Sequence, residues 1–175
     1  MKIIRILALA AAVGAALWAQ QFKFNLDHLA AKAGDSVDVS LNKDMLQFAG
    51  KFLNSKDPDE AKAKNLINGL EGIYVKSFEF KHDNEWSAAD LELVRSQLKA
   101  PEWSRIVGVK SGSDSETVEI HVRTEAGKVT GVAILATEAR QFTVANIVGN
   151  VPLDSLADLG GQFGLPKLRT PPKKK

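Results

Sequence analysis

The second half of the chain contains four segments with the pattern of strands, and the strict period of two in one of them constrains the fold most strongly. In residues 117–123, valine and isoleucine occupy one face, while Glu119, His121 and Arg123 occupy the other. Alternation of this kind predicts a strand with one buried face and one solvated face. Short polar turns separate the four segments, which predicts an antiparallel meander over 105–111, 117–123, 129–137 and 142–149.

The first half has the pattern of helices. Apolar residues recur at helical spacing from Met45 through Phe48 to Phe52, which predicts a helix buried along that stripe. Asp57 then precedes a proline, and with Glu60 it has the spacing of a helix start. Further along, Ser87 and Asp90 have the spacing of a capping box for a third helix, which Pro101 ends.

Two more strands are expected, one at 36–41, before the first of these helices, and one at 73–81, between the second and the third. Helices therefore gather in the first part of the chain and strands in the second, which is typical of an α+β domain. We expect an antiparallel β-sheet with helices packed on one face, formed as a single domain by residues 20–166.

The first 19 residues have the layout of a secretory signal peptide. Lys2 and Arg5 precede an apolar stretch, and small residues follow before the chain turns polar at Gln20. An uncleaved membrane anchor is the alternative, but the apolar run is shorter than the roughly 20 residues that a spanning helix needs. We expect cleavage after Ala19 or Ala16, and a periplasmic or secreted protein.

The chain has no cysteine. Disulfides, thiol catalysis and thiolate zinc sites are therefore excluded, and so is lipid attachment through a cysteine. The net charge of +2 comes from the ends of the chain, because residues 20–166 carry 16 basic and 21 acidic side chains. We therefore expect no nucleic-acid partner.

Residues 167–175 form a basic tail, which we expect to be disordered. Its last three residues, Lys173, Lys174 and Lys175, could make weak contacts with an anionic surface. A solubilising tail without a partner explains the same residues.

The histidines are the main candidates for chemistry, and they are far apart in the sequence. His82 lies close to Asp83 and Glu85, a group that could bind a divalent ion, although a solvated turn explains the same residues. His121, on the polar face of its strand, is expected to be exposed beside a charged neighbour. The sequence contains no zinc-protease motif and no serine-nucleophile elbow. We therefore assign no catalytic residue, no metal ligand and no cofactor.

Four segments carry a resemblance to a known family: GLEGIYVKSFEF, WSRIVGVKS, ANIVGNV and GQFGLPKL. They resemble a family of small exported bacterial proteins known as domain of unknown function 4252, and the similarity runs from roughly Ser36 to Leu168. Members typically carry a signal peptide, often of the lipoprotein type. A lipid tether does not transfer to this cysteine-free chain. The resemblance implies no catalytic residues, cofactor or substrate.

These observations favour a non-enzymatic binding or regulatory accessory module of the bacterial envelope. It would act on an envelope protein partner through a face or an edge of its sheet. Two alternatives stay open at this point. One is a carrier of a small ligand or lipid, and the other is an exported hydrolase or metal-dependent enzyme that uses His82 or His121.

Overall fold

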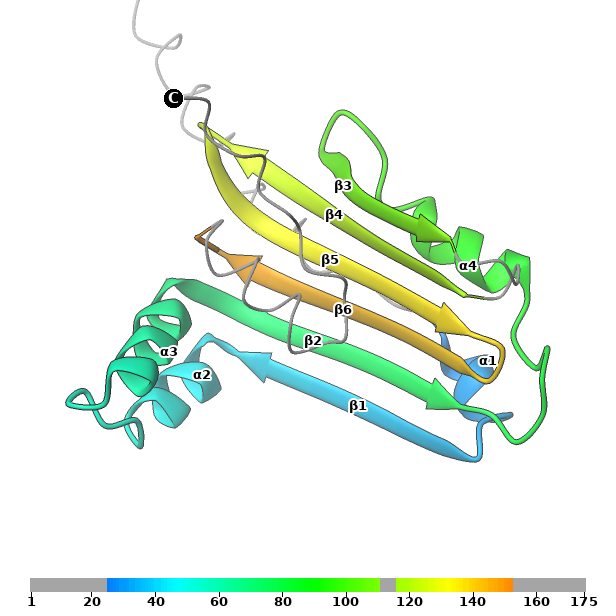
Figure 1. Ribbon diagram of the computed structural model, residues 1–175, viewed down its shortest axis with the longest axis horizontal. Coiled ribbons are helices and arrows are strands. Elements are labelled where there is room, and N and C mark those ends of the chain that lie inside the picture. The colour runs from blue at the N-terminus through cyan, green and yellow to red at the C-terminus, as the bar shows by residue number, and fades with distance from the viewer. Residues whose placement is uncertain (1–24, 111–115, 153–175) are drawn as a thin grey trace, which may run out of the picture.

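A computed structural model describes residues 25–110 and 116–152 of the chain. Six antiparallel strands form one sheet in the order β1-β2-β6-β5-β4-β3, with four helices around it (Figure 1). This arrangement confirms the predicted α+β fold. The predicted signal peptide and basic tail lie outside the described residues.

The last four strands form the predicted meander. They are β3 (Trp103–Lys110), β4 (Thr117–Glu125), β5 (Lys128–Glu138) and β6 (Gln141–Gly149), and each pairs with the next. Ala126 and Gly127 both have positive φ, 49° and 76°, which suits a two-residue hairpin between β4 and β5. The other two strands, β1 (Asp35–Asn42) and β2 (Leu70–Glu79), extend the sheet because β2 pairs with β6.

The described residues contain four helices, and the last two begin at the predicted capping residues Asp57 and Ser87. They are α1 (Asp27–Ala30), α2 (Lys43–Gly50), α3 (Pro58–Gly69) and α4 (Ala88–Arg95). The Asp57 side chain accepts hydrogen bonds from two backbone N–H groups at the start of α3, and Ser87 and Asp90 form a reciprocal capping box on α4. Within the described ranges, no helix combines the length and apolar character that crossing a membrane requires.

Buried apolar side chains form two clusters, one on each face of the sheet. The first lies beneath α1 and α4, where Leu29, Leu91 and Val94 pack against β2, β5 and β6. The second contains Leu46 of α2 and alternate residues of β4, β5 and β6, with Leu66 and Ile67 of α3 packed against it. Figure 1 shows α2 and α3 together at one end of the sheet.

The predicted buried stripe of α2 is wrong. Met45, Phe48 and Phe52 are 51%, 60% and 74% exposed, whereas Leu46 is 2% exposed. The helix instead turns Leu46 and Gly50, four residues apart, toward the second cluster. A Cβ on Gly50 would lie 3.6 Å from Ile67, so the small residue brings α2 close to α3. The side of α2 that is buried is therefore determined by its packing against α3 and not by where its large apolar residues lie.

The solvated face predicted for residues 117–123 is also wrong. Glu119 and His121 on this face are 3% and 6% exposed. The reason is that α4 lies against the same side of β4, as the hydrogen bonds between Arg95 and Glu119 show. His121 is therefore a buried residue and not the exposed one that alternation predicts.

Two phenylalanines test the assignment of core and surface. Phe142 is fully buried, with its ring 5.6 Å from that of Trp86. Phe142→Ala should lower the free energy of unfolding by about 3–5 kcal/mol because it leaves a cavity. Phe52→Ala, in the exposed turn after α2, should change it by about 1 kcal/mol or less, because only the edge contact with the Phe48 ring is lost. Urea unfolding of both variants measures these values, and similar losses would contradict the assignment.

Candidate functional site

A cleft of about 370 Å³ lies between α4 and the strands β3 and β4. Its volume falls in the range of small-molecule sites. The first two turns of α4 form one wall, and the strands form the other. Both charged and apolar side chains line the cleft: Ala88, Leu91, Arg95, Arg105, Gly108, Val109, Lys110, Thr117 and Glu119.

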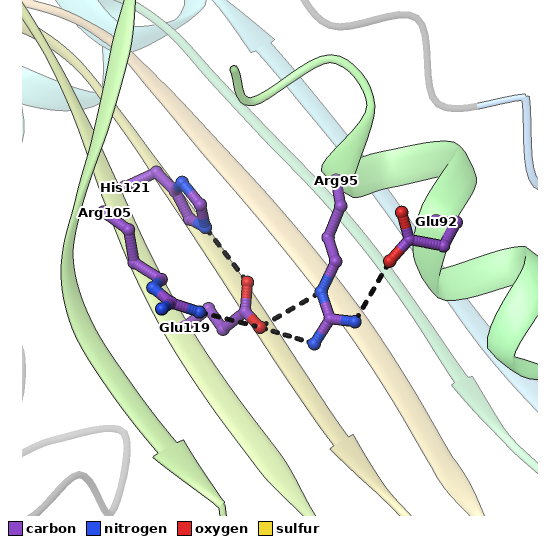
Figure 2. A network of polar contacts seen from close by, with 5 residues as sticks. All are labelled: Glu92, Arg95, Arg105, Glu119 and His121. Atoms are coloured by element: carbon purple, nitrogen blue, oxygen red, sulfur yellow. Dashed lines mark hydrogen bonds and ion pairs between the residues drawn. The ribbon is translucent and has the colours of Figure 1, made fainter. Parts of the chain in front are cut away.

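The carboxylate of Glu119 is the centre of a polar network in this cleft (Figure 2). Arg95 of α4 donates two hydrogen bonds to its Oε1, from Nε and from Nη2. His121, two residues along β4, lies with Nε2 3.1 Å from the other oxygen, Oε2. An ionised carboxylate only accepts hydrogen bonds, so His121 is the donor in this contact. Both oxygens of Glu119 are thus occupied by side chains of the protein.

Two further charged residues complete the network. Glu92 lies one turn before Arg95 on α4, and its Oε1 accepts a hydrogen bond of 3.2 Å from Arg95 Nη1. Arg105 of β3 approaches from the other side, with Nη1 3.8 Å from Glu119 Oε1. The side chain of Arg105 passes close to Gly108: a Cβ on Gly108 would lie 3.4 Å from its Nε, at ordinary van der Waals distance.

The network keeps Glu119 ionised. Burial alone would raise the pKa of its carboxyl group, but hydrogen bonds and positive charge from Arg95 and His121 outweigh burial and lower it below the ordinary glutamate value. Hydrogen bonding to Glu119 in turn raises the pKa of Arg95. The site therefore holds fixed charges of both signs.

One nitrogen of His121 is left over. With Nε2 donating to Glu119, Nδ1 is buried and has no hydrogen-bond partner among the described residues. A buried polar atom without a partner is uncommon in folded proteins. His121 does not line the cleft, so this nitrogen lies behind the carboxylate and not at the ligand surface.

His28 has a structural role. Its Nε2 lies 2.6 Å from Asp90 Oδ1, and Asp90 also accepts hydrogen bonds from Ser87 at the start of α4. Burial would raise the pKa of Asp90, but the bonds from His28 and Ser87 outweigh it and lower the pKa below its ordinary value. The contact thus ties α1 to the first turn of α4.

The turn at His82 uses its carboxylates to hold the chain. Glu85 accepts a hydrogen bond from the backbone N–H of His82, and Asp83 accepts one of 2.6 Å from Arg140. In the part of the chain that the structure describes, no three histidine or acidic side chains gather in a way that could hold a metal ion. The turn and the strand histidine, His121, have separate partners.

Sequence reasoning missed the site because its residues come from three elements. Alternation placed Glu119 and His121 on one face, but it did not show what covers that face. The available signal was Arg95, which directly follows the buried Val94 of α4 and is only partly exposed. A cation beside a predicted core position is a candidate partner for a buried carboxylate, because a buried charge must be paired.

The network predicts that Glu119→Gln lowers the free energy of unfolding by an amount that depends on pH. The folded pKa of Glu119 lies below the unfolded value of about 4.3, so its ionisation stabilises the fold above that pH and the contribution fades as pH falls through the folded pKa. At about pH 7 the variant should lose about 1.5–3 kcal/mol in free energy of unfolding. The loss should shrink as the pH falls through the folded pKa, because the wild-type group is protonated below it.

Urea unfolding across this pH range measures the difference between the two proteins. Glu102→Gln, on an exposed residue, is the matched control and should follow the wild type throughout. A loss in Glu119→Gln that does not depend on pH would show that the charge of Glu119 contributes nothing to stability.

Comparison with protein families gives one match. Residues 31–159 match the model of a family described as Domain of unknown function (DUF4252). The matched range contains every residue that lines the cleft. No curated protein matches the chain.

Proposed function

The chain belongs to the DUF4252 family, and from that premise we propose that it is an exported, non-enzymatic binding module whose ligand occupies the cleft between α4 and the strands β3 and β4. The observation that carries the proposal is the buried, ionised Glu119, which is bound by Arg95 and His121 beneath an accessible cleft. A framework of fixed charges suits recognition, because a rigid and preorganised site loses little entropy on binding.

The same geometry disfavours the hydrolase alternative. A general base must reach the proton that it removes from the substrate. Both oxygens of Glu119 already accept hydrogen bonds, and the lowered pKa keeps this group from acting as an acid near neutral pH. Nδ1 of His121 is buried away from the cleft lining. Binding is therefore the better supported activity.

The signal-peptide pattern of the first 19 residues supports export. With no cysteine in the chain, the exported protein would be free in the periplasm or outside the cell. The proposal includes an accessory role in the envelope. Ligand binding in the cleft would control how the protein contacts an envelope partner.

Binding at the cleft can be tested with two neighbouring alanines. Ala88 and Ala89 are both exposed in the first turn of α4, but only Ala88 lines the cleft. A library of small polar and charged compounds is screened by amide NMR. Compounds that bind should shift the amide signals of Gly108, Thr117 and Glu119. Ala88→Phe should abolish these shifts because its ring fills the cleft, whereas Ala89→Phe should retain them.

Two results would contradict the proposal. One is a set of shifts that map to other surfaces, and the other is equal binding by the two phenylalanine variants. Circular dichroism of both variants checks that α4 is intact.

A further inference from the structure

We infer that the ligand of this cleft is a small organic anion, whose acidic group pairs with Arg105 and whose apolar body lies against Leu91 and Val109. The inference rests on the proposed function, because it names the chemical class that the same cleft binds. The position of Arg105 in the lining, its hydrogen-bonding state and the apolar part of the lining each support it.

Two guanidinium groups, those of Arg95 and Arg105, line the cleft. Arg95 is compensated by Glu119 and Glu92, to which it donates hydrogen bonds. Arg105 approaches an acidic group only at 3.8 Å among the described residues. Arg105 is therefore the guanidinium of the lining that can attract an anionic group of a ligand.

Arg105 is the cation with spare hydrogen-bonding capacity. Arg95 uses three N–H donors, two on Glu119 and one on Glu92. Arg105 makes, among the described residues, one ion pair at 3.8 Å, which is longer than a hydrogen bond. Its side chain is 60% exposed and lines the cleft. A guanidinium with free donors pairs with a carboxylate or a phosphate through two parallel hydrogen bonds.

Glu119 places Arg105 for this role. The carboxylate is close enough to attract the guanidinium, yet its oxygens are already bound to Arg95 and His121. Arg105 is thus held beside Gly108 while its guanidinium group keeps N–H donors for a ligand. A ligand anion can supply the missing acceptors without displacing an existing hydrogen bond.

Part of the lining is apolar, and the volume of the cleft limits the size of the ligand. Leu91 and Ala88 of α4 and Val109 of β3 supply hydrocarbon surface. The volume of about 370 Å³ equals the share of roughly a dozen water molecules at ~30 Å³ each. A ligand with an acidic group and a short aliphatic body fits both the volume and the lining.

Matched probes test the acidic group directly. N-acetyl-leucine and N-acetyl-leucinamide share one body, but only the first carries a carboxylate; isopentyl phosphate carries a phosphate on a similar body. Titrations of the full chain are followed by amide NMR. At least one of the two anions should bind ~10-fold or more tightly than the amide, because a hydrogen bond to a charged group is at stake. Comparison of the two anions distinguishes a carboxylate ligand from a phosphate ligand.

Three variants connect this preference to Arg105. Arg105→Gln should bring the affinities of anion and amide close together, and Arg105→Lys should restore part of the preference, because charge returns without the planar fork. Lys128→Gln removes the same charge from the exposed first residue of β5 and should leave the preference intact. Circular dichroism checks folding, and an exposed arginine is a position where substitution is tolerated.

The outcomes separate this inference from the proposed function. If the acid, the phosphate and the amide bind equally and Ala88→Phe abolishes all three, the inference of an anionic ligand is refuted. The proposed function, that the cleft binds a ligand, is then still supported. A preference for anions that survives Arg105→Gln would overturn the role of Arg105. No binding by either anion would also overturn the inference, and the compound screen would then decide separately whether the cleft binds anything.

Discussion

The contact between Glu119 and Arg95 is the interaction on which the site depends. A buried carboxylate costs several kcal/mol unless a cation and further donors compensate it. Arg95 supplies two hydrogen bonds and His121 a third, which joins α4 to β4 through the polar side of the sheet. The cleft is the space between α4 and the strands β3 and β4 beside this contact.

The position of Arg95 depends in turn on how α4 is fixed. Ser87 and Asp90 cap the helix, and Asp90 also contacts His28 of α1. Leu91 and Val94 anchor the same helix in the first cluster, so Arg95 follows at the end of a buried stripe. The capping contacts and the apolar core together direct a guanidinium at Glu119. The contacts that cap and anchor α4 therefore also determine the shape of the cleft beside it.

The elements of the fold could be predicted because their signals are local. Alternation marked the strands, and Asp57 and Ser87 marked two helix starts. Burial could not be predicted in the same way, because it depends on distant partners. α4 buries the polar face of β4 at Glu119, and α3 buries Leu46 of α2 in place of Phe48. Pairing of β2 with β6 likewise joins segments that are about 70 residues apart.

The proposed binding site requires Glu119 to be a fixed charge and not a proton donor or acceptor. Carboxyl ¹³C NMR of the folded protein, with Glu119 assigned through Glu119→Gln, measures this property directly. We expect the titration midpoint of Glu119 to lie below the ordinary glutamate pKa, because Arg95 and His121 stabilise the ionised form. A midpoint above the ordinary value would contradict it, since burial would then dominate and Glu119 would be poised for acid–base chemistry.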